Sequence, residues 1–290
     1  MSGVGWPAPA KINLFLHINR QREDGYHELQ TVFQFLDYVD ELSFSVTHDT
    51  VIRHTRLPTG IDAENELCVR AARLLQQHGN IDQGVEITLD KRIPPGGGFG
   101  GGSSDAATTL QALNRLWGAN LPQDELAGLG LQLGADVPVF LRGQTAWAEG
   151  VGERLTPIAL DPRWYLLLVP DVQIITADIF SRPELTRDSP PITIRAFREG
   201  RVRGQLRNDL EPVVIKLYPQ VDEVLQWLRS FGDPKFGNPR MTGSGAGVFL
   251  PVKNREQGEK ILAQCPGKWT GYVAQGLAQS PLVRRLAQEN

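Results

Sequence analysis

The sequence contains only two cysteines among its 290 residues, Cys68 and Cys265. That number is too small for a disulfide framework, and Cys68 has the pattern of a small buried hydrophobic residue. No apolar run approaches the ~20 residues that a membrane-spanning helix needs. The first ten residues also lack the basic and apolar segments of a secretory signal. We therefore expect a cytoplasmic protein with no membrane partner.

An excess of positive charge is also missing. The chain has 30 Lys and Arg against 33 Asp and Glu, for a net charge of −3, so no basic field indicates nucleic-acid binding. Its five histidines show no H-x-x-x-H spacing, and no transition-metal site can be predicted. The composition is that of a globular protein with 41% hydrophobic residues, long enough for one large domain or two ordinary ones.

Helical and strand patterns alternate along the whole chain. Strands are expected at residues 12–19, 31–35, 41–47, 85–89, 137–141, 145–148, 165–169, 247–250 and 271–274, and helices at 66–77, 107–117, 122–133, 221–228 and 257–263. The pattern breaks at Asp161-Pro162-Arg163. We therefore expect an α+β fold with one domain in residues 1–160 and a second in 161–290.

The densest signal is a glycine-rich stretch between an expected strand and an expected helix. Its residues are Pro94, Pro95, Gly96, Gly97, Gly98, Phe99, Gly100, Gly101, Gly102, Ser103 and Ser104. Glycine lets the backbone approach a ligand closely, and a helix N-terminus offers unpaired N–H groups to a phosphate. A flexible linker is the alternative, but linkers are usually featureless on both sides. The stretch is expected to bind phosphate.

Two familiar phosphate motifs do not fit this stretch. The dinucleotide-binding version needs an acidic residue about 20 positions further on, where this chain has Asn120-Leu121-Pro122. A P-loop needs a lysine where Ser103 stands. Backbone amides and hydroxyl groups are therefore expected to hold the phosphates. Tight NAD binding would revive the first alternative.

The loop resembles the phosphate-binding motif of the GHMP kinases, which include galactokinase, homoserine kinase and mevalonate kinase. Further family motifs follow in order: PAKINL at 9–14, DGYH at 24–27, LGADVPVF at 133–140, NDLE at 208–211 and MTGSGAG at 241–247. The resemblance covers nearly the whole chain and is strongest to the branch that phosphorylates 4-diphosphocytidyl-2-C-methyl-D-erythritol. It implies a two-domain GHMP kinase fold with the active site in the cleft between domains.

The resemblance also implies a reaction and its partners. ATP with Mg²⁺ would be the phosphate donor, and the γ-phosphoryl group would pass to the 2-hydroxyl of the methylerythritol unit, in the non-mevalonate isoprenoid pathway. Such a transfer depends on alignment and charge stabilisation. The partner would be a small molecule carrying cytidine diphosphate, and the protein a monomer or weak dimer. The Mg²⁺ ligands remain unknown, with Asp105 as one candidate.

Two charged residues receive catalytic roles from the resemblance. Asp136 would be the base, and Lys11 would orient it and steady the developing charge. From the residues alone, Asp136 is equally well a helix cap and Lys11 a solvated surface residue. Asn13 lies two positions further along the same strand face and is a candidate for binding substrate.

The remaining site residues also follow from the resemblance. The substrate-binding candidates are Tyr26, His27, Phe33, Thr176, Phe180, Gly243 and Ser244, and Lys91 would lie beside adenine. Each aromatic residue taken alone is more often part of a core. The family places an asparagine directly before Leu67, where this chain has Glu66, so no adenine contact is predicted there or at Asn65. A kinase for another small alcohol and a non-catalytic ATP sensor are the rival functions.

Overall fold

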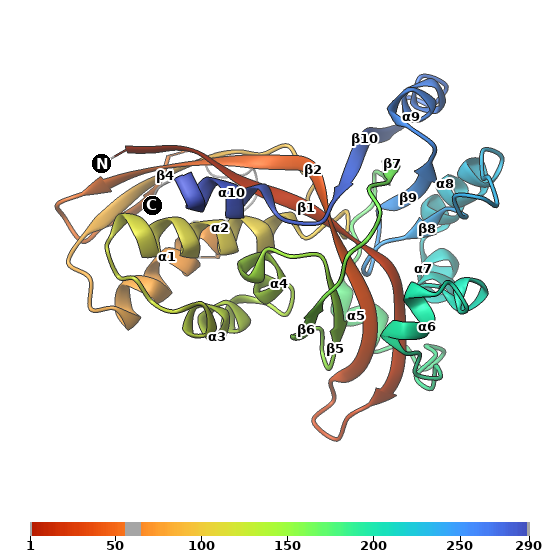
Figure 1. The fold of residues 1–290 in the computed structure, drawn as a ribbon, viewed down its shortest axis with the longest axis horizontal. Helices are drawn as coiled ribbons and strands as arrows, with labels where there is room; N and C mark the ends of the chain where they lie inside the picture. The colour runs from red at the N-terminus through yellow and green to blue at the C-terminus, as the bar shows by residue number, and fades with distance from the viewer. Residues whose placement is uncertain (1, 56–64, 289–290) are drawn as a thin grey trace.

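The computed structural model describes residues 2–55 and 65–288, and two long antiparallel strands run through it (Figure 1). These are β1 (Ser2–Gln21) and β2 (His27–Thr47). They pair from Ser2 opposite Ser45 to Gln21 opposite His27, with several register shifts that bend the ribbon. The strands expected at 31–35 and 41–47 are one continuous strand, because the polar residues that separate them stay within the ladder.

The first lobe builds a sheet on this ribbon and covers it with helices. Its further strands are β3 (Ile52–His54), β4 (Gly84–Asp90), β5 (Ala146–Glu149) and β6 (Arg154–Pro157). Its helices are α1 (Leu67–His78), α2 (Gly101–Leu116), α3 (Gln123–Leu133), α4 (Val137–Arg142) and α10 (Pro281–Gln288). Helix α2 lies in the middle and is buried along most of its length, so the glycine loop leads directly into the core.

Residues 137–141 were expected to form a strand, and this prediction is wrong. They form α4, whose five residues from Val137 to Leu141 are all buried. A short, continuous apolar run fits either a buried strand or a buried helix, so its periodicity cannot decide. The deciding features are Pro138 in the first turn and Gly143, which ends the helix with a left-handed φ of 65°.

The second lobe is a smaller sheet with helices packed against it. Its strands are β7 (Trp164–Pro170), β8 (Arg240–Met241), β9 (Val248–Val252) and β10 (Trp269–Leu277), in the order β10-β7-β9-β8. Its helices are α5 (Thr176–Phe180), α6 (Ile194–Arg198), α7 (Glu211–Leu217), α8 (Pro219–Arg229) and α9 (Arg255–Leu262), with a 3₁₀ turn at Arg203–Gln205. Strand β10 joins this sheet to β2 through Gly276 and Leu277.

Strand β1 contributes side chains to every hydrophobic cluster of the fold. Trp6 belongs to the core of the first lobe, Ile12 and Phe15 to two clusters between the lobes, and Leu16 and Ile18 to the core of the second lobe. The sheet and helices in both lobes confirm the α+β class, while the division at residue 160 stays a prediction. Within the described residues, no helix is long and apolar enough to cross a membrane.

Candidate functional site

The glycine loop of residues 94–104 contacts a second glycine loop, residues 241–247, which belongs to the other lobe. Gly96 accepts a hydrogen bond from the Ala246 amide at 2.9 Å, and Gly97 accepts one from the Gly247 amide at 3.2 Å. Gly98 has a left-handed φ of 70°, and a Cβ there would lie 2.2 Å from the Thr242 carbonyl oxygen. Only glycine permits this backbone contact, which explains why both motifs are rich in it.

Helix α2 starts within this stretch, at Gly101, and has an open N-terminus. Its N-cap is Gly100, with φ of 72° and no side-chain hydrogen bond to the first turn. The unpaired N–H groups and the partial positive charge of a helix start suit a phosphate. Ser103 lines the cleft in front of this helix start. The Oγ of Ser104 and the Oδ1 of Asp105 are buried without a hydrogen-bond partner in the described part of the chain.

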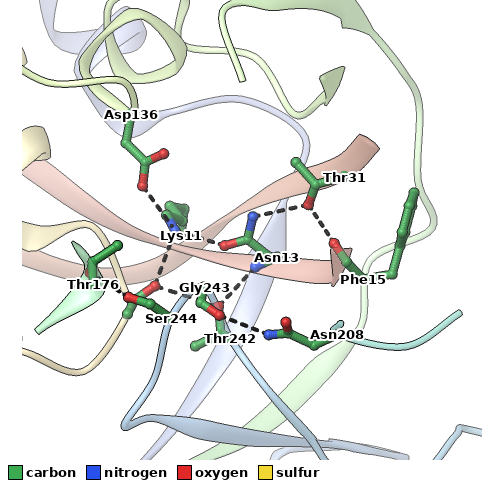
Figure 2. A network of polar contacts seen from close by, with 11 residues as sticks. Lys11, Asn13, Phe15, Thr31, Asp136, Thr176, Asn208, Thr242, Gly243 and Ser244 are labelled. Carbon is green, nitrogen blue, oxygen red and sulfur yellow. Dashed lines mark hydrogen bonds and ion pairs between the residues drawn. The ribbon is translucent and has the colours of Figure 1, made fainter. Parts of the chain in front are cut away.

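Lys11 lies on β1 at the point where the loop and the cleft meet (Figure 2). Its Nζ is 3.1 Å from Asp136 Oδ2, and it donates to Asn13 Oδ1 at 2.7 Å and to the Gly98 carbonyl at 3.1 Å. These three acceptors match the three donors of an ammonium group. The side chain is 3% exposed, so the cation is buried but fully partnered, which is the condition for keeping a charge inside a protein.

Asp136 directs its carboxylate toward Lys11 and the cleft (Figure 2). It occupies the N-cap position of α4, but its side chain makes no capping hydrogen bond. The carboxylate is 34% exposed, so a ligand can reach it. The helix-cap interpretation therefore does not account for this carboxylate, which is oriented by the lysine.

Asn13 is fixed on both sides of its amide group. Its oxygen accepts from Lys11, and its Nδ2 donates to Thr31 Oγ1 at 2.9 Å. The Asn13 backbone N–H donates to Thr242 Oγ1, also at 2.9 Å. Thr242 belongs to the predicted motif at 241–247, whereas no sequence pattern singled out Thr31, which also lines the cleft (Figure 2).

The cleft in front of these groups has a volume of about 380 Å³ and is lined by both lobes. The predicted residues that line it are Lys11, Asn13, Phe33, Gly96, Gly98, Gly100, Ser103, Asp136, Thr176, Phe180, Gly243 and Ser244. Phe33 lies beside Lys11, whose Nζ is 5.4 Å from the centre of its ring. The structure therefore brings the predicted catalytic, phosphate-loop and substrate residues to one cavity.

His27 and Phe180 lie together near the far end of the cleft. Their ring centres are 5.1 Å apart, and Arg187 donates from Nε to His27 Nε2 at 3.0 Å. Arg187 also donates to the Phe180 carbonyl at 2.9 Å. Burial, followed by the charge of Arg187, lowers the pKa of His27 from its ordinary value. Tyr26 is 64% exposed and forms no ring contact with another described residue.

Arg187 is a site residue that the sequence did not reveal. It belongs to the proline-rich segment 183–191. The segment has no regular secondary structure, but Leu185 and Ser189 are buried. Only the folded chain places the Arg187 guanidinium against His27, 160 positions away, so no local signal was available.

The second glycine loop is held in place by side chains from two other segments. Asn208 donates from Nδ2 to the carbonyls of Met241 at 3.0 Å and Gly243 at 2.8 Å. Thr176 Oγ1 and Ser244 Oγ are 2.7 Å apart (Figure 2). Their hydroxyl groups therefore lie together at the cleft wall, where they can bind oxygen atoms of a ligand.

Lys91, predicted to lie beside adenine, is part of a buried ion cluster at the start of α2. Its Nζ is 2.6 Å from both Asp40 Oδ2 and Asp105 Oδ2. Burial raises the pKa of Asp105 to about 8; Lys91 opposes this shift and Asp40 adds to it. Burial alone would lower the pKa of Lys91, but the two carboxylates outweigh it and raise that pKa. Lys91 thus links the first turns of α2, through Asp105, to strand β2, through Asp40.

Several other predicted positions lie outside the lining of the cleft. These are Pro94, Pro95, Gly97, Phe99, Gly101, Gly102 and Ser104 of the loop, together with Tyr26 and His27. Phe99 packs its ring into a hydrophobic cluster, while its carbonyl accepts from the Lys11 amide at 2.9 Å. Glu66, which stands at the family's asparagine position, caps α1 by accepting from the Val69 amide at 2.9 Å.

Known proteins share both the sequence and the fold. The family descriptions "GHMP kinases N terminal domain" and "GHMP kinases C terminal" match residues 66–144 and 193–270. The 4-diphosphocytidyl-2-C-methyl-D-erythritol kinase of Alkalilimnicola ehrlichii is 56% identical, over 98% of this chain and 94% of that protein. The enzyme of the same name from Pseudomonas paraeruginosa is 52% identical, over 97% of this chain and 96% of that protein.

Solved structures agree with these sequence relatives. A crystal structure of 4-(cytidine 5'-diphospho)-2C-methyl-D-erythritol kinase superposes with a TM-score of 0.79 at 34% identity, covering 95% of this chain and 99% of that one. The mevalonate kinase of Methanococcus jannaschii has a TM-score of 0.66 at 17% identity, covering 96% and 98%, which shows the shared fold alone. The chain is therefore a GHMP kinase and belongs to the family of 4-diphosphocytidyl-2-C-methyl-D-erythritol kinases.

Proposed function

We propose that this chain transfers the γ-phosphoryl group of ATP to the 2-hydroxyl of 4-diphosphocytidyl-2-C-methyl-D-erythritol, in the non-mevalonate route to isoprenoid precursors. The observation that carries the proposal is the Lys11–Asp136 pair, 3.1 Å apart where the glycine loop opens into the cleft. A family member that bound ATP only as a sensor would have no use for a partly exposed carboxylate oriented by a buried lysine at this point.

The donor phosphates are assigned to the glycine loop and the N-terminus of α2. Backbone N–H groups there would cradle the phosphate oxygens, since no side chain caps the first turn. Mg²⁺ takes oxygen ligands, and the unpartnered oxygens of Ser104 and Asp105 are of the right kind. These two residues would hold it, with Asp105 giving up its proton. The bound cation supplies charge neutralisation for the phosphate oxygens.

The transfer itself is assigned to Asp136 and Lys11. The substrate hydroxyl forms a bond to the γ-phosphorus, the bond from that phosphorus to the ADP oxygen breaks, and the hydroxyl proton passes to the Asp136 carboxylate. Lys11 keeps Asp136 pointed at the cleft through the ion pair and offers positive charge near the reacting oxygens. Asn13 fixes the position of the lysine through its 2.7 Å hydrogen bond.

The cytidine base is assigned to the end of the cleft with His27 and Phe180. The Phe180 ring offers a stacking face, and Tyr26 on the neighbouring turn is exposed and available to cover the base. Because Nε2 of His27 accepts from Arg187, the neutral imidazole carries its proton on Nδ1. Gly243, Ser244 and Thr176 lie along the same wall and are proposed to bind the diphosphate.

A steady-state assay tests the substrate proposal. Purified protein is given ATP and Mg²⁺ with the diphosphocytidyl alcohol, mevalonate or homoserine, and ADP release is followed together with the phosphorylated product. We expect kcat/KM for the diphosphocytidyl alcohol to exceed the other two by ~10³-fold or more, since a nucleobase pocket gives no advantage to a small alcohol. Equal or greater turnover of mevalonate or homoserine would rule the proposal out.

The setting of the reaction is part of the same proposal. We propose that the enzyme acts in the cytoplasm as a monomer or weak dimer, on small molecules and not on nucleic acid. Both cysteines are free thiols, as is usual in a reducing compartment. The cleft with its predicted residues lies within a single chain, so no second copy is required to complete it.

A further inference from the structure

A second cavity of about 690 Å³ lies apart from the active cleft. It is bounded by Leu14 and Gln34 of the central ribbon and by the segments 159–163, 197–206 and 234–240. None of its lining residues also lines the active cleft. The two cavities share strand β1 as a wall, because successive side chains of a strand point to opposite faces: Asn13 faces the cleft and Leu14 faces this second cavity.

The second cavity is strongly cationic. Its lining includes Arg163, Arg198, Arg203, Lys235 and Arg240, against Asp161 as the single acidic residue. None of the five cations forms an ion pair with a carboxylate in residues 2–55 and 65–288. By contrast, two nearby arginines that do not line the cavity form ion pairs with a carboxylate.

The contrast is sharpest around α6. Arg195 and Arg201 both form ion pairs with Glu199. Arg198 and Arg203, from the same stretch of chain, line the cavity and pair with no carboxylate in the described part of the chain. Unpaired cations that gather around one hollow make a local positive potential, which draws anions to it.

The floor of the cavity is buried and polar. Arg240 lies on β8, is half-buried, and donates one N–H to the Leu14 carbonyl, which occupies one of the five donors of a guanidinium. Burial lowers the pKa of Arg240, while Glu211, beyond ion-pair distance, acts in the opposite direction. Beside it, the Tyr165 hydroxyl donates to Gln34 Oε1 at 2.6 Å. A half-buried guanidinium with unused donors is a favourable anchor for an anionic oxygen.

The walls above this floor carry apolar side chains as well as charged ones. Phe197 and Phe249 contribute aromatic rings, and Leu14 and Leu206 contribute aliphatic surface. A cavity of several hundred cubic ångströms that combines some apolar surface with convergent polar groups can bind a small organic molecule. The combination of these walls with the cationic rim defines what kind of molecule fits.

We propose that this second cavity is a binding site for a small organic phosphate, a phosphate mono- or diester group on an apolar body. The phosphate contacts Arg240 at the floor and the exposed cations of the rim, and the apolar body lies against Phe197 and Leu206. The site is independent of the proposed reaction, since it shares no residue with the active cleft. The phosphate is the recognised group, whether it belongs to a separate metabolite or to the nucleotides of the reaction.

Phosphorus NMR with hexyl phosphate as the probe tests the proposal. The probe is titrated with full-length protein at low salt while an unreactive ATP analogue and the diphosphocytidyl alcohol saturate the active cleft. We expect line broadening at millimolar probe or below, and much weaker broadening with inorganic phosphate, which lacks the apolar body. No broadening with or without the cleft ligands, or broadening that the rim variant R198Q/R203Q retains in full, would overturn the site. Adding ATP or CDP as competitors then separates reaction nucleotides from other organic phosphates as the source.

Matched variants locate the binding. The double variant R198Q/R203Q removes two exposed rim cations with no ion pair, so folding is preserved; we expect ~10-fold weaker probe binding. R284Q removes one exposed cation on α10, in the other lobe, and is expected to leave binding unchanged. R240Q is expected to weaken binding ~50-fold, with its fold checked by circular dichroism and by kinase activity. Equal affinity of the rim variant and the parent protein contradicts the proposal.

Discussion

The two ends of the active cleft are built in different ways. The proposed donor end uses backbone: a glycine loop that continues directly into a helix N-terminus, and a second glycine loop within hydrogen-bond distance. The acceptor end uses side chains from separate segments, with His27, Phe180 and Arg187 meeting only in the folded chain. Phosphate is common to many ligands and can be bound by backbone, whereas a particular base needs particular side chains.

Between these ends lies the Lys11–Asp136 pair, and removing its carboxylate should give the largest effect. We expect D136N to lower kcat by ~10³-fold, since a positioned base contributes about 10²–10⁴-fold. Affinity for ATP and for the diphosphocytidyl alcohol should change little, because neither end is touched. Steady-state kinetics with calorimetric titrations of both ligands measure the two effects.

The matched control for that change is D124N. Asp124 has a side chain that is 86% exposed and pairs with Arg142 on the surface. The D124N substitution should leave kcat within a factor of two of that of the parent enzyme. If D136N retained most of the turnover, Asp136 would not be the base. Another group would then have to accept the proton of the substrate hydroxyl.

The backbone character of the donor end can be tested at two glycines of one loop. Gly98 and Gly96 have nearly the same left-handed φ. A Cβ at Gly98 would lie 2.2 Å from the Thr242 carbonyl oxygen, whereas a Cβ at Gly96 would have no described atom within 4 Å. We expect G98A to lower the free energy of unfolding by about 3 kcal/mol and to raise the KM for ATP. G96A should lose only about 1 kcal/mol. Urea unfolding compares them, and equal losses would show that the contact between the glycine loops contributes nothing.

The side-chain character of the acceptor end can be tested at Phe180. Stacking of a base on an aromatic ring contributes about 1–3 kcal/mol, so F180A should reduce kcat/KM for the diphosphocytidyl alcohol by ~30-fold. The KM for ATP should stay constant, which separates the two ends. F180W keeps a stacking face and should recover most of the loss. If the F180A enzyme had a normal kcat/KM, the cytosine base would have to bind elsewhere in the cleft.

The smallest expected effect concerns pH at the acceptor end. The pKa of His27 lies below its ordinary value of 6.5, so the neutral imidazole that accepts from Arg187 is present throughout the neutral range. As pH falls through the lowered pKa, protonation places two cations together and the contact is lost. We expect kcat/KM for the diphosphocytidyl alcohol to fall about fivefold more at acidic pH in the parent enzyme than in H27Q. Identical pH profiles for the two enzymes would show that His27 takes no part in binding the cytosine base.

The same contrast explains which parts could be predicted from the sequence. The glycine loop was recognisable because its residues are contiguous and its composition has a direct physical meaning. Arg187 and Thr31 were not, because each acts through a partner that lies elsewhere in the chain. Lys91 was assigned a place beside adenine, but its ion pairs with Asp40 and Asp105 depend on a tertiary arrangement that no spacing encodes.

The fold was predicted well where periodicity is strong and less well where it is short. The amphipathic helices α1 and α8 and the alternating strand β4 lie close to their predicted positions. Residues 137–141 were assigned to a strand because five apolar residues in a row carry no period. The length of β1 and β2 was also missed, since polar positions inside a strand read as breaks when the partner strand is unknown.

The long ribbon of β1 and β2 has a consequence for how the molecule unfolds. Because β1 contributes to all four hydrophobic clusters, neither lobe can lose its structure without stripping a strand from the other. Contacts such as those of α10 with β1 also join residues far apart in sequence, which makes folding slow. The two lobes should therefore melt together in one cooperative calorimetric transition, and limited proteolysis should not release either as a stable fragment.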